Sequence, residues 1–311
     1  IYFLRSYKEL WIMAYAVCII FLTFAKNNKY TIMVVFPCAK INLGLNIVGV
    51  RTDGYHGSET VFSRVPRADA LGDQHVDRDF PWDVNGDVKI TGNSVDCDEA
   101  DNLVVKAYNL LASDYELPRV HAHLFKRIPS QAGLGGGSSD AAFMIRLLDE
   151  RFRLNLGIAE MERYAARLGA DCAFFITATP AFATGIGDQL EPVDNEQGNL
   201  NGYYIGIVKP NVAVSTREAY QNVKVEKPDV SCRTIVRQPI DTWRESLHND
   251  FEDSVFKIYP KLANIKQRLY QLGALYAQMS GSGSAFYAIF NEAPNNLGQE
   301  FPDCFTFTSI L

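Results

Sequence analysis

A segment near the middle of the chain has residue types and spacing that suit phosphate binding. Residues 128–140, here called the glycine loop, read I-P-S-Q-A-G-L-G-G-G-S-S-D, and four of the five positions from Gly133 to Gly137 are glycine. Glycine loses more backbone entropy than any other residue when it is ordered in a helix or strand, so this run is expected to be irregular. A glycine-rich loop that leads into a helix offers unpaired backbone N–H groups and the positive end of the helix dipole, and both favour a phosphate ligand.

Regular elements are expected on both sides of the glycine loop. Apolar residues alternate with other residues in the stretch 120–128, which indicates a strand. Residues 141–148 carry apolar side chains at helical spacing, and Ser138, Ser139 and Asp140 are the candidate N-caps of that helix. A flexible linker is the alternative interpretation, but linkers seldom lie between a strand and an amphipathic helix.

The glycine loop lacks the marks of two common nucleotide-binding loops. No Lys-Ser or Lys-Thr pair follows the last glycine, as it would in a Walker A sequence. The loop fits the dinucleotide pattern G-x-G-x-x-G only loosely, and no acidic residue ends a second strand about 20 residues later. The sequence therefore favours a phosphate site of another kind.

Length, charge and cysteine usage narrow the class of protein. A chain of 311 residues has room for two domains that share a cleft. A net charge of −6 without a clustered basic face argues against a nucleic-acid partner. Six cysteines without a C-x-x-C motif indicate reduced thiols in a cytoplasmic protein. His121 and His123 share one face of the expected strand, and we interpret them as a solvent-facing pair because no third metal ligand is near in sequence. None of these features bears on the oligomeric state.

The first 32 residues differ from the rest. Residues 10–25 hold no charge and are flanked by Lys8 and Lys26. These sixteen residues fall short of the ~20 that a membrane-spanning helix needs, and no small-residue cleavage site follows clearly. A short anchor or a signal are the alternatives. We expect residues 1–32 to be an extension outside an enzyme that starts near Met33, without a membrane partner.

From Met33 onward, strands and helices mix without regular alternation. Lys40 and Asn42 are expected on the polar face of a half-buried strand over residues 41–47, and Asp171 at the start of an apolar strand over 173–175. Besides the helix after the glycine loop, helices are expected at residues 98–113, 158–168, 243–259 and 262–272. This mixture indicates the α+β class. A polar stretch at 195–201 suits a connection between domains at 33–190 and 191–311.

Two further motifs accompany the glycine loop. The first reads P-C-A-K-I-N-L at residues 37–43, and the second reads M-S-G-S-G-S-A at residues 279–285. In this order the three motifs resemble the signature blocks of the galactokinase, homoserine kinase, mevalonate kinase and phosphomevalonate kinase superfamily, the GHMP kinases. The shorter blocks at residues 51–56 and 168–171 are similar to those of a branch whose alcohol substrate carries a cytidylyl group. The resemblance covers residues 33–290.

The resemblance implies a two-domain α+β kinase with its active site in the interdomain cleft. ATP would be the phosphoryl donor and a small cytidylyl alcohol the acceptor. Mg²⁺ would be held largely by nucleotide oxygens, because no dedicated metal motif is present. Asp171 would act as the general base. Lys40 would keep Asp171 ionised and offset the charge that builds on the transferring oxygens.

The resemblance also implies two sets of binding residues. The set for ATP is Pro129, Ser130, Gln131, Ala132, Gly133, Leu134, Gly135, Gly136, Gly137, Ser138, Ser139 and Asn102. The set for the alcohol is Asn42, Tyr55, His56, Tyr220, Gly281, Ser282 and Gly283. Within it, Tyr55 and Tyr220 are expected to sandwich the cytosine ring while His56 bonds its edge. Gly136 is expected to need a positive φ.

The chain departs from the family pattern at Cys172-Ala173, where the family has Val-Pro. This change leaves Asp171 in place but frees the local backbone. Two alternatives stay open at this point, namely another member of the superfamily and a nucleotide-binding regulator without catalysis. The Gly54-Tyr55-His56 block argues against the first, and the presence of both Lys40 and Asp171 argues against the second.

Overall fold

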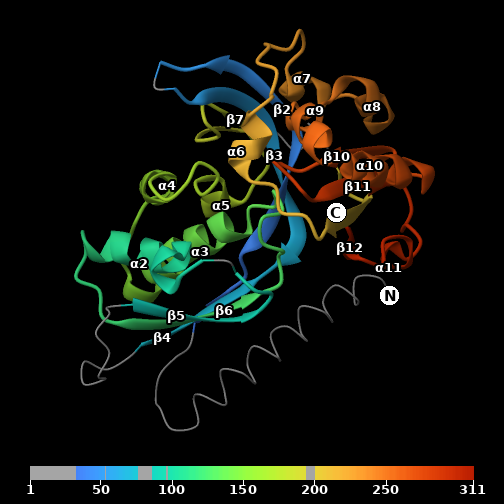
Figure 1. Ribbon diagram of the computed structural model, residues 1–311. Coiled ribbons are helices and arrows are strands. Elements are labelled where there is room, and N and C mark those ends of the chain that lie inside the picture. The colour runs from blue at the N-terminus through green and yellow to red at the C-terminus, as the bar shows by residue number, and fades with distance from the viewer. Residues whose placement is uncertain (1–32, 53, 76–85, 96, 194–199) are drawn as a thin grey trace.

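The computed structural model describes residues 33–52, 54–75, 86–95, 97–193 and 200–311 (Figure 1). The apolar segment 10–25 lies outside these residues, as does most of the polar stretch 195–201. Among the described residues, none of the helices combines the length and apolar character required to cross a membrane.

Two long strands run through the middle of the molecule. The strands β2 (Cys38–Val50) and β3 (His56–Ala68) pair antiparallel, and β7 (Ala181–Thr184) and β8 (Gln189–Pro192) complete a sheet of order β2-β3-β7-β8. In Figure 1 this pair passes between a group of N-terminal helices and a group of C-terminal helices. The catalytic candidates of β2 are therefore positioned where these two groups meet.

A second sheet leads into the glycine loop. Its order is β1-β4-β6-β5, formed by β1 (Met33–Val35), β4 (Ala70–His75), β6 (Val120–Lys126) and β5 (Gly86–Gly92), with β5 and β6 parallel. The helices on this side are η1 (Glu99–Asp101), α2 (Leu103–Ala112), α3 (Gly136–Phe152), α4 (Ile158–Ala166) and α5 (Phe174–Thr177). The apolar face of α3 is buried in the core between them, which fixes the direction in which the helix N-terminus points.

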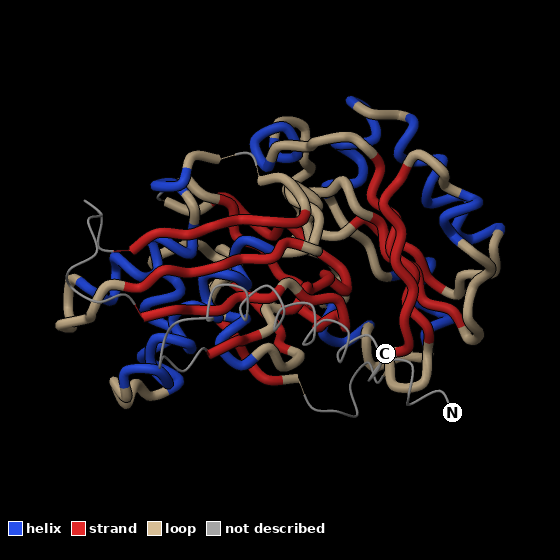
Figure 2. The backbone as a smooth tube through the Cα atoms, turned by 90° about the horizontal axis from the view of Figure 1, so that it is seen from below, coloured by secondary structure: helices blue, strands red, loops and turns tan. Residues whose placement is uncertain are grey.

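The C-terminal half has a sheet of its own. It has the order β10-β11-β9-β12 and is built from β9 (Tyr204–Pro210), β10 (Tyr276–Met279), β11 (Phe286–Phe290) and β12 (Cys304–Ile310). Its helices are α6 (Thr216–Tyr220), α7 (Cys232–Ile235), η2 (Ile240–Thr242), α8 (Trp243–Ser246), α9 (Phe251–Ile258), α10 (Lys261–Gln271) and α11 (Leu297–Glu300). Figure 2 shows this sheet at the right, with helices on its outer side. The α+β prediction is confirmed.

Two predicted elements differ from the structure. The helix expected over residues 243–259 is broken between α8 and α9, because Leu45 of β2 donates its N–H to His248 O at 2.8 Å and accepts from Asp250 N at 2.9 Å. The strand expected after Asp171 is wrong, since Phe174–Thr177 forms a short helix. A short apolar run does not distinguish a buried strand from a buried helix.

The burial predicted for two pairs of residues is also wrong. Lys40 and Asn42 are each only 2 % exposed, because both faces of β2 are covered. His123 is 5 % exposed and lies 2.8 Å from the Thr91 hydroxyl, and burial lowers its pKa. His121, which is partly buried, pairs with Asp87 at 2.6 Å. Alternation within one strand does not show whether a second layer covers its polar face.

Candidate active site

A cavity of about 840 Å³ lies where the N-terminal helices, β2 and the C-terminal half meet. Most of the residues predicted for the site line it. They are Lys40, Asn42, Asn102, Pro129, Ser130, Gln131, Ala132, Gly133, Leu134, Gly135, Gly136, Gly137, Ser138, Asp171, Tyr220, Gly281, Ser282 and Gly283. Three predicted residues, Ser139, Tyr55 and His56, are not part of its lining.

The glycine loop is held against β2, the strand that carries Lys40. The backbone N–H of Lys40 donates to Leu134 O at 3.0 Å. Gly133 and Gly135 have φ values of 73° and 69°, in the left-handed region that favours glycine. A Cβ atom at Gly135 would lie 2.7 Å from the Phe175 ring. These glycines therefore satisfy both a backbone conformation and a close approach.

The start of the helix differs from the prediction. Gly135 is the N-cap of α3, and Ser138, Ser139 and Asp140 lie within its first turns rather than before it. Gly136 does not have a positive φ. Gly136, Gly137 and Ser138 nevertheless line the cavity, so the first turn, whose N–H groups have no partner within the helix, lies at its wall. The arrangement suits an anionic phosphate.

A buried charge cluster fixes the entry to the glycine loop. Asp69 accepts hydrogen bonds from the backbone N–H groups of Arg127 and Ile128 and from the ammonium of Lys126. Lys126 also donates to Asp140 Oδ2 at 2.7 Å. Burial opposes the charge on Lys126, but the two carboxylates outweigh it and raise its pKa. Burial raises the pKa of Asp140 well above its usual range, since one ammonium does not compensate two carboxylates.

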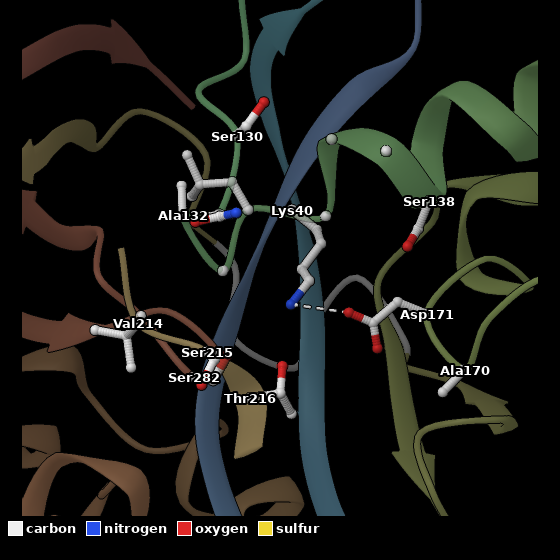
Figure 3. A pocket seen from close by; sticks show the side chains of 18 of the residues that line it. Lys40, Ser130, Ala132, Ser138, Ala170, Asp171, Val214, Ser215, Thr216 and Ser282 are labelled. Carbon is white, nitrogen blue, oxygen red and sulfur yellow. Dashed lines mark ion pairs between the residues drawn. The ribbon is translucent and has the colours of Figure 1, made fainter. Parts of the chain in front are cut away.

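The two catalytic candidates meet across the cavity. The Lys40 ammonium lies 3.2 Å from Asp171 Oδ2, although 131 positions (171 − 40) separate the two residues in the chain (Figure 3). The Lys40 side chain is 3 % exposed and that of Asp171 is 34 % exposed. The carboxylate is therefore open to a ligand, whereas the ammonium is enclosed by protein. In Figure 3 both side chains lie below the start of α3, which carries Ser138.

Asn42 gives Lys40 a second partner. The Lys40 ammonium donates to Asn42 Oδ1 at 2.6 Å, and Asn42 Nδ2 donates to the Thr60 hydroxyl at 3.0 Å. The lysine is thus fixed between an amide oxygen and a carboxylate oxygen. Thr60 was not singled out from the sequence, because nothing in the spacing of the chain pairs it with Asn42.

Cys172, which occupies the position where the family has valine, is fully buried. Burial raises the pKa of its thiol to about 12, while a hydrogen bond with Ser138 acts in the opposite direction. The thiol is therefore neutral at physiological pH and takes no part in nucleophilic chemistry.

The glycine-serine turn at residues 280–284 packs directly on the glycine loop. Ser280 Oγ donates to Gly133 O at 2.8 Å, and Ala285 N donates to Ala132 O at 3.1 Å. A Cβ atom at Gly133 would lie 1.9 Å from Ser280 O. The turn itself is held by Asn249, another residue missed from the sequence. Its Nδ2 donates to Met279 O at 2.8 Å and to Gly281 O at 2.9 Å.

Of the aromatic residues predicted to bind the cytosine ring, only some lie together. The rings of His56 and Tyr220 stack with centroids 4.7 Å apart, and Tyr220 meets Phe251 edge-on at 4.8 Å. Tyr55 is 66 % exposed and lies outside the lining of the cavity. Burial, and secondly the charge of Asp171, raise the pKa of Tyr220. The ring that stacks on Tyr220 is therefore that of His56 and not that of Tyr55.

Asn102 serves as a helix cap at the edge of the cavity. It is the N-cap of α2, and its Oδ1 accepts from Val104 N at 2.9 Å. Its side chain is 6 % exposed and lines the cavity. The capping bond uses the oxygen and leaves the amide NH₂ of Asn102 available for a ligand.

Comparison with known proteins identifies the family. The GHMP kinases N terminal domain matches residues 102–179, and the GHMP kinases C terminal domain matches residues 233–305. The 4-diphosphocytidyl-2-C-methyl-D-erythritol kinase of Bacteroides thetaiotaomicron is 51 % identical over 261 residues, covering 83 % of this chain and 92 % of that protein. The enzyme of the same name from Bacteroides fragilis is 47 % identical over 279 residues, covering 90 % of this chain and 100 % of that protein.

Solved structures show the same fold. A crystal structure of 4-(cytidine 5'-diphospho)-2C-methyl-D-erythritol kinase superposes with a TM-score of 0.71 at 27 % identity, covering 89 % of this chain and 98 % of that one. Galactokinase from Lactococcus lactis, crystallised with galactose, superposes with a TM-score of 0.61 at 15 % identity, covering 95 % of this chain and 98 % of that one, and shows the fold alone. The chain therefore belongs to the GHMP kinases, and within them it groups with the 4-diphosphocytidyl-2-C-methyl-D-erythritol kinases.

Proposed function

We propose that this kinase transfers the γ-phosphoryl group of ATP to the 2-hydroxyl of 4-diphosphocytidyl-2-C-methyl-D-erythritol, a step in the non-mevalonate route to isoprenoid precursors. The observation that carries the proposal is the Lys40–Asp171 pair, 3.2 Å apart, in a cavity that the N-terminus of α3 also lines. The names of relatives that are 47–51 % identical support the choice of alcohol.

In this proposal Asp171 acts as the general base. Its Oδ2 is engaged by Lys40, so Oδ1 is the oxygen that accepts the proton of the substrate hydroxyl. As this proton moves to Asp171, the hydroxyl oxygen forms a bond to the γ-phosphorus and the bond from that phosphorus to the bridging oxygen of ADP breaks. The Lys40 ammonium stabilises the carboxylate beforehand and the negative oxygens during transfer.

The residues that line the proposed ATP site suit the binding of phosphate groups better than the direct binding of a metal ion. In the described part of the chain, no group of three or more His, Cys, Asp or Glu residues could hold a metal. The proposal is therefore that Mg²⁺ is held mainly by the phosphate oxygens, where it would neutralise their charge. On the protein side, the first turn of α3 would direct its N–H groups to the same phosphates.

The two halves of the cavity would bind different ligands. Asn102 and residues 129–138 would contact ATP. Asn42, Tyr220 and the turn at 281–283 would contact the alcohol, and His56 would support Tyr220 by stacking on it. Five cysteines of the described chain are unpaired, which supports a cytoplasmic location because disulfides are rare there.

An assay of ADP release with a panel of alcohols tests the proposal. The protein is incubated with ATP, Mg²⁺ and one of four acceptors, namely the cytidylyl methylerythritol, homoserine, mevalonate or galactose. Turnover with the first acceptor alone is expected. Turnover with one of the other three instead would assign the chain to a different activity of the superfamily, and ATP binding without turnover of any acceptor would favour a regulator.

A further inference from the structure

Thr60 is buried in the wall of the cavity and has no part in the chemistry described so far. It lies on β3, is 2 % exposed and lines the cavity close to Lys40. Its hydroxyl makes two hydrogen bonds, one to Gly44 O at 2.5 Å and one with Asn42 Nδ2 at 3.0 Å. Both partners belong to β2, the strand that carries Lys40.

The direction of these two bonds follows from the chemistry of the groups. A carbonyl oxygen only accepts, so the single proton of the Thr60 hydroxyl points to Gly44 O. The hydroxyl must then accept from Asn42, which places the amide NH₂ of Asn42 toward Thr60 and its Oδ1 toward Lys40. In the reversed orientation, the amide NH₂ of Asn42 would face the Lys40 ammonium, so two donors would meet. The amide oxygen would face the Thr60 hydroxyl oxygen, whose proton is already given to Gly44 O. The hydroxyl therefore fixes the orientation of the Asn42 amide.

A bulge in β2 makes this arrangement possible. Leu43 pairs with Val61 and Leu45 pairs with Thr60, so Gly44 has no partner in the ladder. Gly44 has a φ of 69°, and a Cβ atom there would lie 2.6 Å from Leu247 Cδ1. Its carbonyl, released from the ladder, accepts the Thr60 proton instead.

We propose that Thr60 is a positioning residue of the kinase, acting through Asn42 on Lys40. Without the hydroxyl, Asn42 loses the acceptor that holds its NH₂, and its amide is anchored only at its oxygen, by the Lys40 ammonium. Lys40 then keeps Asp171 as its fixed partner, whereas the second one, which lies 2.6 Å away in the intact site, is less firmly positioned. The inference rests on the proposed function, because the position of Lys40 matters for phosphoryl transfer.

The test compares Thr60→Val, which keeps the shape but removes the hydroxyl, with Thr60→Ser, which restores it. In the ADP-release assay, Thr60→Val should lower kcat about 10-fold or more, the equivalent of one buried hydrogen bond, while KM for ATP stays within about twofold. Thr60→Ser should recover most of the lost kcat. Thr91→Val is the matched control, because it removes a threonine hydroxyl from a strand of another sheet, and its kcat should equal that of the wild type.

A double-mutant cycle with Asn42 distinguishes a positioning role of Thr60 from a role in packing alone. If Thr60 acts through Asn42, adding Thr60→Val to Asn42→Ala should cost no further kcat. Independent losses in the double variant, or a Thr60→Ser variant as slow as Thr60→Val, would overturn the inference. Thr60→Ala enters the same cycle should Thr60→Val fail to fold.

A spectroscopic readout keeps this inference distinct from the proposed function. In protein labelled with ¹⁵N-asparagine, the side-chain NH₂ signal of Asn42 should shift in Thr60→Val and stay near its wild-type position in Thr60→Ser. This result does not depend on turnover. If the wild-type chain turns over none of the alcohols, the proposed function is wrong. If the Asn42 signal does not shift in Thr60→Val, the positioning role of Thr60 is wrong.

Discussion

The carboxylate of Asp171 has two oxygens in different surroundings. Oδ2 faces Lys40 at 3.2 Å, while about a third of the side chain is exposed to the cavity and its mouth. An ion pair that fixes one oxygen and access to the other are what the proposed base needs to be held in place and still reach a substrate proton.

Asp171→Asn should therefore remove catalysis and spare nucleotide binding. The amide keeps the shape of the carboxylate but cannot accept the hydroxyl proton, so kcat should fall roughly 10²–10⁴-fold. Calorimetry should show ATP bound with near wild-type affinity. Asp188→Asn is the control, since Asp188 is exposed on the neighbouring β7–β8 turn and does not line the cavity. Unchanged turnover of Asp171→Asn would exclude Asp171 as the base.

Tyr220→Ala should weaken binding of the alcohol. Tyr220 stacks on His56 and lines the cavity, and a base stacked on an aromatic side chain gains ~1–3 kcal/mol. KM for the cytidylyl alcohol should rise about 10-fold with KM for ATP unchanged. Tyr55→Ala should have a smaller effect, because Tyr55 is exposed and does not line the cavity. Equal increases in both KM values for Tyr220→Ala would mean that Tyr220 supports the fold instead.

At the scale of elements, the segment between α8 and α9 connects β2 to the glycine-serine turn. His248 O and Asp250 N bond to Leu45 of β2, and Asn249 holds the carbonyls of Met279 and Gly281. The Asp250 carboxylate also accepts from Ile47 N at 2.7 Å. A break in a helix thus supplies the backbone and side-chain groups that join two parts of the site.

Asn249→Ala should lower both activity and stability. It leaves the carbonyls of Met279 and Gly281 without their donor, and each buried unpaired group costs about 1–3 kcal/mol. Tyr276→Phe is the control, because it removes a hydrogen bond to Leu247 O of the same segment without touching the turn. Thermal unfolding should be affected in both variants, but kcat/KM should fall only in Asn249→Ala. A parallel loss of kcat/KM in Tyr276→Phe would indicate general destabilisation.

The glycine loop and its helix were predictable from sequence, because composition and spacing within a short window determine them. The bulge at Gly44 and the helix break at 247–250 were not, since each depends on partners far away in the chain. Spacing alone did not pair Lys40 with Asp171 either, and that expectation came from the family resemblance. The burial of Lys40 likewise depends on residues far away in the chain, because Phe62, Gly135 and Asp171 lie around its side chain.

At the scale of the whole molecule, the N-terminal and C-terminal halves make a close backbone contact at Gly133. The carbonyl of Gly133 accepts from Ser280 Oγ, and there is no space for a side chain at Gly133. We propose that residues 33–190 form the ATP-binding domain and residues 191–311 the alcohol-binding domain, although β8 runs two positions past this boundary, to Pro192. The contact at Gly133 would then set the spacing between both ligands.

Gly133→Ala should destabilise the whole protein, whereas Gly137→Ala should not. The first variant places Cβ 1.9 Å from a backbone oxygen at a φ of 73°, so the free energy of unfolding should fall by about 3 kcal/mol or more. In the second, the nearest atom is 3.8 Å away and helix propensity improves by ~1 kcal/mol. Denaturant unfolding of both variants measures the difference. A Gly133→Ala variant as stable as the wild type would show that the halves do not meet as described.

The strand order of the C-terminal sheet has a consequence for biosynthesis. Strand β9 lies between β11 and β12, and both of these partners follow it in the chain. While the ribosome adds residues 211–285, β9 therefore has neither of its neighbours, and its backbone N–H and C=O groups lack their final partners. The glycine loop and Asp171 have by then already been synthesised. A nascent chain thus carries the glycine loop and Asp171 well before Tyr287 can donate to Asn42 O, 245 positions earlier, and join β11 to β2.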